Sequence, residues 1–432
     1  MPSTSSAVLE NHGPDYDKYT ALYKHFHANP ELSWLENETA AKVVDTLKTF
    51  SPDFEFQTGI GGTGLFAVLR NGPGKTIMLR ADMDALPVEE DTGLDYASTK
   101  KMKDDKGELR PVMHACGHDM HVTALLAAAE TLVSSRPLWS GIIVFLFQQA
   151  EEKMAGAKAM IADGLFTKYA CPIPDVVLGQ HVLWGKAGTV YGNSGPVMTA
   201  ADGMKIKVFG RGGHGSQPHR TVDPVVLAAH IILRLQTIVS REVPPGELAV
   251  VTVGALNVGN AANIITHEAV LQVSTRSVNP KWRGVIHDAI RRIVKAECEA
   301  SNSPKEAEIE VMFATDTVDN DEALQAALSE SFAQHFKDAW NPKAEIVTAS
   351  EDFNELANAV GKPYCFWFFG GHDPAEDEAL SAEGGLENIA TNHSPFFAPV
   401  IQPTLKTGTE ALVVAALTFL GAAGAAAAST NL

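Results

Sequence analysis

The stretch GIIVFLF at residues 141–147 is followed immediately by QQAEE at residues 148–152. A near-continuous apolar run of this length is typical of a strand that is covered on both faces in an α/β sheet. A second such run, DVVLG at residues 175–179, comes after a short helix predicted over residues 155–165. Strand and helix therefore alternate, as they do in a doubly wound α/β domain.

The flanking segments extend this domain on both sides. Helical spacing over residues 16–50, broken at Asn29-Pro30, predicts two helices. The turn NGPG at residues 71–74 separates two apolar segments and predicts a hairpin-like strand pair. The remaining predicted elements are a helix over 119–134 with Asp119 as its cap, a strand at 365–369, a helix over 407–420 and a frayed low-complexity tail.

The pattern changes near Gly195-Pro196. From there to Ala314 the chain reads strand, helix, strand, strand, helix, strand, which is a compact split β-α-β arrangement. The predicted fold is therefore α/β with a mixed, mostly parallel sheet flanked by helices, plus an inserted α+β domain. The sheet domain is discontinuous and consists of residues 1–195 and 315–432, and the inserted domain covers residues 196–314.

The composition excludes several classes of partner. The 432 residues carry 34 Lys and Arg against 52 Asp and Glu, a net charge of -18, which disfavours nucleic acid and anionic membranes. We find no signal-peptide pattern and no apolar run long enough to span a bilayer, so we expect a cytoplasmic protein. The four cysteines follow no disulfide framework.

Metal-ligand side chains crowd one short segment. MHACGHDMH at residues 113–121 holds three histidines, a cysteine and an aspartate ahead of a predicted helix. Alone, this cluster is equally compatible with helix capping and a buried cysteine. Three further sites, each placed just beyond a predicted strand, together with a histidine late in the chain, favour a metal centre, because ligands in open α/β sheets bind outside the carboxyl ends of strands. The three sites are Asp82 with Asp84, Glu151 with Glu152, and His181, and the late histidine is His393.

The number of candidate ligands predicts two metal ions. One tetrahedral ion with an open position needs only three protein ligands, whereas this chain offers five: Cys116, His118, Glu152, His181 and His393. Of two adjacent carboxylates, one can bind metal while the other accepts a proton from water, whose pKa the metal lowers.

Together these motifs resemble the aminoacylase and carboxypeptidase superfamily of metallopeptidases, and most closely its branch of hippurate hydrolases and plant auxin-conjugate amidohydrolases. The resemblance rests on HANPELS at 27–33, RADMDALP at 80–87, HACGHDMH at 114–121, QAEE at 149–152, HGSQPH at 214–219 and NHSP at 392–395.

The resemblance implies a role for each candidate residue. Cys116 bridges the two ions, His118, Glu152, His181 and His393 complete the two sites, and Glu151 is the general base. The inserted domain is a lid and dimerisation domain, so a homodimer is expected. His214 stabilises the tetrahedral oxyanion, often in the partner's site, while Asn263 and Arg276 hold the amide and the carboxylate of a small N-acyl amino acid. A guanidinium suits a carboxylate on physical grounds as well.

The chain departs from its relatives at one position. Asp82 stands where other branches have a metal-binding histidine, so we expect it not to be a ligand and expect Asp84 to orient a ligand from behind. Two divalent ions are implied, manganese or zinc first, with cobalt and nickel also compatible. The expected reaction is hydrolysis of N-acyl amino acids by a metal-activated water. The alternatives are a deacetylase or dipeptidase on a biosynthetic intermediate, a non-catalytic metal-binding scaffold, and a thiol redox enzyme, which lacks the required Cys-x-x-Cys pair.

Overall fold

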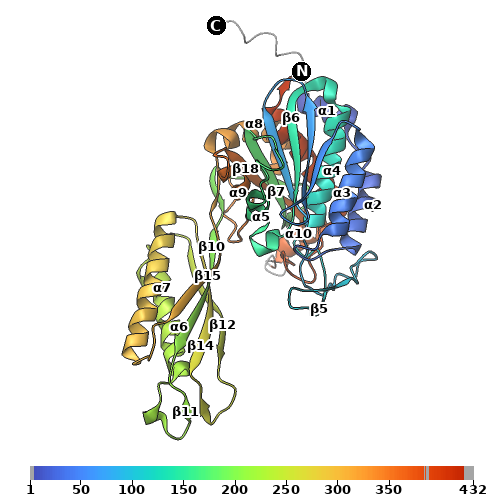
Figure 1. The fold of residues 1–432 in the computed structure, drawn as a ribbon. Coiled ribbons are helices and arrows are strands. Elements are labelled where there is room, and N and C mark those ends of the chain that lie inside the picture. The colour runs from blue at the N-terminus through green and yellow to red at the C-terminus, as the bar shows by residue number, and fades with distance from the viewer. Residues whose placement is uncertain (1–3, 384, 386–388, 423–432) are drawn as a thin grey trace. The chain divides into compact units, whose positions relative to one another are not determined.

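The computed structural model describes residues 4–383, 385 and 389–422, and the chain divides into two compact units (Figure 1). The first unit consists of Met1–Val197, Asp319–Glu345 and Asp352–Leu432, and the second of Met198–Val318 and Ile346–Glu351. The chain passes between them at β9 (Gly195–Met198) and β16 (Val318–Asn320), which pair with each other, and again at residues 345–346 and 351–352. The tail expected to fray, residues 423–432, lies outside the described residues.

A mixed sheet forms the centre of the first unit. Its strands lie in the order β1 (Glu55–Ile60), β2 (Gly64–Asn71), β6 (Trp139–Gln148), β3 (Thr76–Asp82), β7 (Val176–Lys186), β18 (Tyr364–His372), β8 (Val190–Tyr191) and β17 (Trp340–Asn341), with β19 (Gly421–Ala422) beside β6. The pairs from β6 through β3 and β7 to β18 are all parallel, and so is the β8–β17 pair. The predicted mixed, mostly parallel sheet is confirmed.

The predicted hairpin between β2 and β3 is wrong. Strand β6 lies between these two strands, and its Val144 pairs with Val68 of β2 on one side and with Met78 of β3 on the other. The physical reason is that β6 is apolar along nearly its whole length, so it is most stable at the centre of the sheet, with neighbours on both edges and both faces.

Helices cover both faces of this sheet (Figure 1). One layer packs on β3, β7 and β18 and contains α4 (His118–Ser134) and α11 (Ile401–Phe419). Four helices pack outside these two: α1 (Thr4–His12), α2 (Tyr16–Ala28), α3 (Asn37–Phe50) and α8 (Glu322–Phe336). The helices α5 (Gly156–Ala162) and α9 (Asn354–Asn358) pack on β6 and β7, and α10 (Pro374–Glu383) follows β18.

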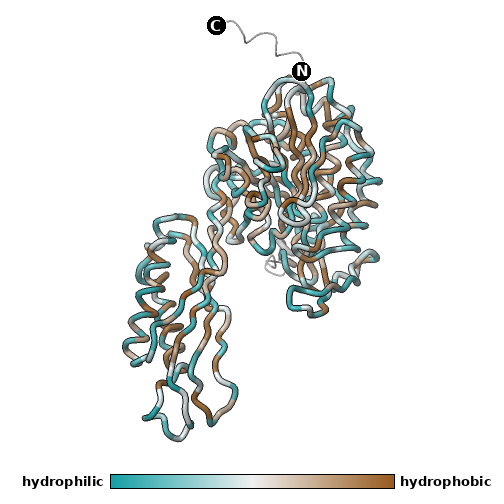
Figure 2. The backbone as a smooth tube through the Cα atoms, in the orientation of Figure 1, coloured by the Kyte–Doolittle hydropathy of each residue, from teal (hydrophilic) through white to brown (hydrophobic). Residues whose placement is uncertain are grey.

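The core explains why these strands form. The side chains of β3 are buried along its whole length, and so are those of β6 from Phe145 to Gln148, which places apolar residues on both faces of the sheet. Figure 2 shows the same strands in brown, the colour of hydrophobic residues. Burial of this kind is worth about 25 cal/mol per Å² of apolar surface. The sheet is thus the rigid base on which the site loops stand.

The second unit is a four-stranded antiparallel sheet with two helices. Its strands lie in the order β12 (Ala249–Val258), β14 (Glu268–Ser277), β10 (Ala200–Phe209) and β15 (Glu308–Thr315), beside α6 (Pro224–Arg241) and α7 (Pro280–Ala300). Asp223 and Asn279 cap the two helices through their side chains, and proline follows each cap at the first helical position. The β-α-β-β-α-β order predicted from the sequence is confirmed.

Helix α6 corrects one expectation about membranes. It has 18 residues with a hydropathy of 1.2, so by length and composition it could cross a bilayer. Its buried side, including Leu227, Ile231 and Leu235, packs in the core of the second unit. Core helices pass the same compositional test, so length and hydropathy alone do not assign α6 to a membrane.

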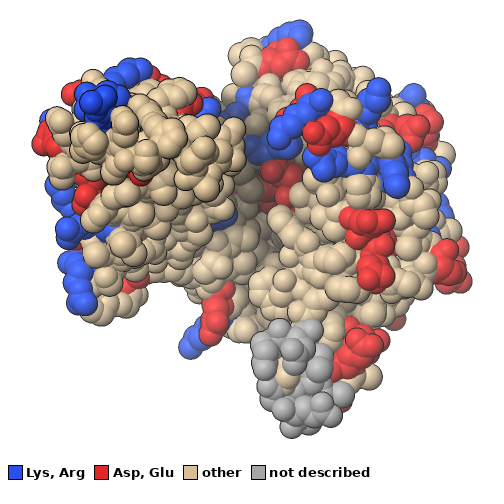
Figure 3. Space-filling model, turned by 90° about the horizontal axis from the view of Figure 1, so that it is seen from below, with Lys and Arg blue, Asp and Glu red and all other residues tan. Residues whose placement is uncertain are grey.

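On the face shown in Figure 3, positive and negative side chains are mixed.

Candidate metal centre

The segment around Cys116 turns sharply into helix α4. Gly117 has φ of 81°, and a Cβ there would lie 2.4 Å from Val182 Cγ1, so only glycine fits between Cys116 and His118. The helix begins at His118 with Gly117 as its N-cap. The expectation that Asp119 caps this helix is therefore wrong, because the Asp119 carboxylate is buried against His27 at 2.7 Å.

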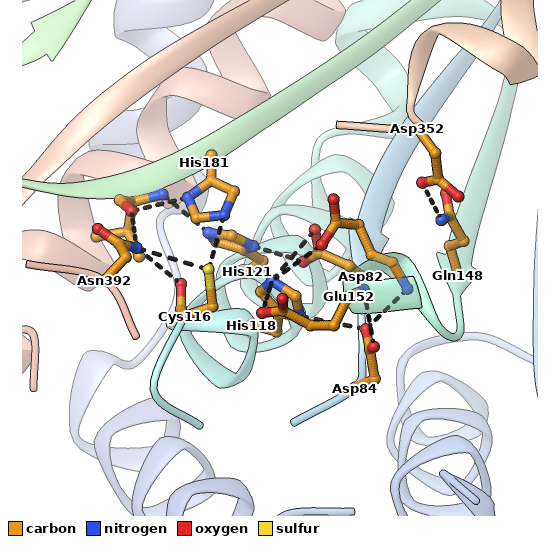
Figure 4. Close-up of polar contacts among 12 residues, drawn as sticks. Asp82, Asp84, Cys116, His118, His121, Gln148, Glu152, His181, Asp352 and Asn392 are labelled. Atoms are coloured by element: carbon orange, nitrogen blue, oxygen red, sulfur yellow. Dashed lines mark hydrogen bonds and ion pairs between the residues drawn. The ribbon is translucent and has the colours of Figure 1, made fainter. Parts of the chain in front are cut away.

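Two of the site histidines, His118 and His181, each have Nδ1 next to an oxygen acceptor. His118 Nδ1 lies 3.3 Å from Asp84 Oδ1, and His181 Nδ1 donates to the carbonyl of Val182 at 2.8 Å. The Nε2 atoms of both rings are thereby left as lone-pair donors. His181 Nε2 lies 3.5 Å from Cys116 Sγ (Figure 4). His181 lies within β7 rather than just beyond it, because that strand continues to Lys186.

The acidic pair lies in a strained turn directly after β6. Ala150 and Met154 on either side of it have φ of 50° and 51°, values that are uncommon for residues other than glycine. Asp84 accepts hydrogen bonds from the backbone amides of Glu151 and Glu152, both at 3.1 Å. The backbone of both acidic residues is therefore held by the same residue that contacts His118.

His393 approaches the pair from the far end of the chain. Its backbone amide donates to the carbonyl of Ala115 at 2.7 Å, and its Nε2 lies 3.4 Å from Glu152 Oε1. Its φ is 72°, and its side chain is 57% exposed, in contrast to the buried ring of His118. Hydrogen bonds to Cys116 and Glu152 raise the pKa of His393 to about 10.

The predicted ligands thus meet at one place. Their donor atoms form three groups, each within 4.8 Å: Cys116, His118 and His181; Cys116, Glu152 and His393; His118, Glu151 and Glu152. Cys116 belongs to two of the groups. Among the described residues, His118 Nε2 is buried without a hydrogen-bond partner, which costs free energy unless an ion satisfies it. The donor set of thiolate, imidazole and carboxylate suits borderline divalent metals.

Asp82 forms a further donor group with His118 and His121, and its Oδ2 lies 3.8 Å from His118 Nε2. Its carboxylate accepts from Arg80 at 2.6 Å and from His121 Nδ1 at 2.5 Å, while His121 Nε2 accepts from the amide of Val182 at 2.8 Å. Burial raises the pKa of Asp82, but the charges of His118 and Arg80 outweigh burial and hold it well below its usual range. Burial lowers the pKa of His118, whereas Asp82 and Asp84 raise it well above its ordinary value.

Two residues near the site carried no predicted role. Asn392 donates to the carbonyls of Cys116 at 3.2 Å and Val182 at 3.1 Å, and His121 fixes Asp82. Both stand inside the quoted motifs, next to predicted ligands. Their positions in these motifs could have marked them as site residues. Only the three-dimensional contacts show which groups they bind.

The structure brings two of the predicted lid residues together. In the second unit, β11 (Gly213–His214) pairs with β13 (Ile264–Ile265), and the amide of Gly215 donates to the carbonyl of Asn263 at 2.8 Å. His214 and Asn263 are both exposed. Ser216 fixes the His214 ring, since its backbone amide and hydroxyl lie 3.1 and 2.8 Å from Nδ1. His214 Nε2 is therefore the free ring nitrogen.

Arg276 lies away from these two residues. Strand β14 begins at Glu268, close in sequence to β13, which pairs with β11. Arg276 lies near the other end of β14 and donates to Ser350 Oγ. Eight residues of strand at roughly 3.4 Å each separate Arg276 from Glu268 by about 27 Å. Burial lowers the pKa of the Arg276 guanidinium. One small substrate cannot contact Arg276 and His214 of the same copy.

Comparison with known proteins is consistent with this geometry. A model of the peptidase family M20/M25/M40 matches residues 78–394, which include every predicted metal ligand. The hippurate hydrolase of Campylobacter jejuni is 39% identical over 357 residues, 81% of this chain and 87% of that enzyme. The N-acyl-L-amino acid amidohydrolase of Geobacillus stearothermophilus is 37% identical over 292 residues, 66% of this chain and 74% of that enzyme.

A solved structure shows the same fold. The YXEP protein of Bacillus subtilis, described as a dinuclear metal binding peptidase from the M20 family, covers 94% of this chain and 98% of its own, with a TM-score of 0.72 at 24% identity. The resemblance inferred from the motifs is thus confirmed. The chain belongs to the peptidase family M20/M25/M40 and is a hydrolase that acts on amide bonds.

Proposed function

We propose that this protein hydrolyses the amide bond of N-acyl amino acids, with Glu151 as the general base. The observation that carries the proposal is the acidic turn held by Asp84 beside Cys116, His118, Glu152, His181 and His393. The names of the hippurate hydrolase and the N-acyl-L-amino acid amidohydrolase support this substrate class.

The same five side chains would hold two divalent ions, with Cys116 between them. Cys116 is shared by the donor group that contains His181 and the donor group that contains His393, which supports a bridging role for its thiolate. When bound, two such ions supply Lewis acidity, which lowers the pKa of water and polarises a carbonyl group. Manganese and zinc are the first candidates because both accept imidazole and carboxylate ligands.

Glu151 is placed to move a proton. Its backbone is held by Asp84, and its Oε2 lies 3.9 Å from His118 Nε2, at the edge of the ligand cluster. In this position the carboxylate accepts a proton from the attacking water and returns it to the leaving amine. A positioned base of this kind contributes about 10² to 10⁴ in rate.

The second unit supplies the groups that bind substrate. A His214 ring fixed through Nδ1 can direct Nε2–H at a developing oxyanion, and Arg276 can pair with the substrate carboxylate. Because the two residues are far apart within one unit, we propose that His214 serves the neighbouring subunit of a dimer. The exposed apolar residues Val226 and Leu233 of α6 and Val250 of the edge strand β12 provide a surface for that dimer.

A substrate panel tests the proposal. The purified protein, loaded in turn with manganese, zinc, cobalt and nickel, is assayed against hippurate, N-acetyl amino acids, indole-acyl conjugates and dipeptides. We expect turnover of N-acyl amino acids with at least one metal, abolished by a chelator and restored by that metal. Turnover of dipeptides alone would show a dipeptidase instead, and bound metal without any turnover would show a non-catalytic scaffold.

A further inference from the structure

The acidic turn begins at Ala150 and is held from outside at each of its first three backbone amides. Asp84 accepts from the amides of Glu151 and Glu152 (Figure 4). The amide of Ala150 donates to Glu36 Oε1 at 2.9 Å, across a separation of 114 residues in the chain. Two buried carboxylates, those of Asp84 and Glu36, therefore fix the backbone that carries the proposed base.

Ala150 needs such an external partner. Its φ of 50° and ψ of 40° lie in the left-handed region, which a residue other than glycine keeps only where the surrounding structure enforces it. The next residue is Glu151, whose Oε2 lies 3.9 Å from His118 Nε2. If the Ala150 amide loses its acceptor, the turn can relax towards an ordinary φ, and the Glu151 carboxylate then moves away from the ligand cluster.

The Glu36 side chain does not serve the helix that it precedes. Glu36 is the N-cap residue of α3, a position whose side chain commonly accepts from the first turn, yet among the described residues it makes no such bond. Glu31 takes this part instead, because its carboxylate accepts from the amides of Glu38 at 3.2 Å and Thr39 at 2.8 Å. The Glu36 carboxylate is thus directed at the acidic turn rather than at α3.

Both oxygens of the Glu36 carboxylate are fixed. Oε1 also accepts from the amide of Trp34 at 3.0 Å, and Oε2 accepts from the hydroxyl of Thr63 at 2.5 Å. Thr63 lies in the turn between β1 and β2, so the three donors come from three separate segments. The side chain of Glu36 is wholly buried. It therefore presents a preset acceptor to Ala150 before any substrate binds.

The ionised carboxylate at this position lowers the stability of the fold. Burial and the charge of Asp84 raise the pKa of Glu36 to about 7, although the bonds from Thr63 and Ala150 lower it. Because the folded pKa exceeds the unfolded one, the free energy of unfolding falls as pH rises from about 4.5 to about 7. A neutral side chain of the same length should therefore not unfold the protein at pH 8.

From these contacts we infer that Glu36 is a positioning residue for the proposed base: its carboxylate holds the amide of Ala150 and so sets where the Glu151 carboxylate lies. The inference rests on the proposed role of Glu151 in amide hydrolysis and deepens it. The role is geometric, so it requires an acceptor oxygen at the right distance from Ala150.

Four substitutions separate this reach from the fold. Glu36→Ala removes the acceptor, Glu36→Asp keeps the charge but is one methylene too short, and Glu36→Gln keeps the length and one acceptor oxygen. Glu31→Ala is the matched control, because Glu31 is a buried carboxylate of the same segment whose bonds go to α3. Melting temperatures at pH 8 identify any variant that fails to fold. If Glu36→Ala fails, Glu36→Asp decides.

Each variant is assayed with saturating metal on an N-acyl amino acid that the wild type hydrolyses. We expect Glu36→Ala and Glu36→Asp to lower kcat about 10- to 100-fold with little change in KM, because a displaced base costs rate rather than binding. Glu36→Gln should recover most of this loss, and Glu31→Ala should match wild type per folded molecule. An equal loss in Glu31→Ala, a loss confined to KM, or no recovery in Glu36→Gln would overturn the inference.

Amide hydrogen exchange tests the inference without turnover. In chelated protein, the peptide that covers residues 149–154 should exchange faster in Glu36→Ala than in wild type and Glu31→Ala, measured by mass spectrometry. Equal exchange in all three proteins would overturn the positioning role. If the wild type hydrolyses no N-acyl amino acid, the proposed function fails, and the exchange of this peptide alone decides whether Glu36 holds the turn.

Discussion

The backbone amide of Glu151 donates a 3.1 Å hydrogen bond to Asp84 Oδ1. This bond holds the backbone at Glu151 independently of the side-chain carboxylate. We therefore expect Glu151→Gln to keep its fold and its metal but to lose about 10² to 10⁴ in kcat, because an amide cannot accept a proton. Metal content by elemental analysis and kcat by single-substrate kinetics check both parts. A variant with near-native kcat would remove Glu151 from the mechanism.

Cys116 should change its reactivity with the metal. All four cysteines are free and buried, and burial raises the pKa of Cys171 to about 12, so Cys171 serves as an internal reference. A thiolate that binds two ions is not free to attack an alkylating agent. We expect slow alkylation of Cys116 in the metal-loaded protein and faster alkylation after chelation, measured by peptide mass spectrometry. Equal rates in the two states would argue against a bridging thiolate.

His27 should make stability depend on pH. The ring is fully buried between Asp119 at 2.7 Å and Glu90 at 3.0 Å, and it faces Tyr23 and Tyr96. Burial lowers the pKa of His27, but the hydrogen bonds to Asp119 and Glu90 raise it to about 9. Because the folded pKa exceeds the unfolded one, the stabilisation is complete below about pH 6.5 and is lost as pH rises through about 9.

The size of this effect follows from the same values. A tenfold change in proton affinity is worth about 1.4 kcal/mol. The protonated His27 ring therefore contributes on the order of 3 kcal/mol to the free energy of unfolding at pH 6. Urea unfolding of chelated wild type and His27→Gln at pH 6 and pH 10 measures it. We expect a large difference in unfolding free energy at pH 6 and a small one at pH 10. A difference independent of pH would assign the role of His27 to packing alone.

Mixed dimers test the proposed role of His214. His214→Ala and Glu151→Gln are each expected to be nearly inactive. If His214 acts on the neighbouring subunit, mixing the two restores part of the activity, because each hybrid dimer has one site with both residues intact. A double variant mixed with His214→Ala is the control and should restore nothing. Subunit exchange shown by native mass spectrometry without recovery would mean that His214 does not act in trans.

Sequence alone determined the residue types of the site and the order of the elements. Five ligand-type residues and the Glu151-Glu152 pair are visible as short motifs, because metal chemistry restricts the side chains that can serve it. The apolar run over residues 141–147 predicted a buried strand, and alternating patterns predicted the split β-α-β unit, because burial depends on periodicity along the chain.

Only the tertiary structure decided the contacts between residues distant in sequence. Strand β6 separates β2 from β3 because strand order depends on which apolar faces need cover, which no local turn reveals. Asp82 pairs with His121, Ser33 with Asp84, and Glu36 with the amide of Ala150, through hydrogen bonds between segments far apart in the chain. Such bonds depend on distances of a few ångströms, and a sequence records the order of residues but not those distances.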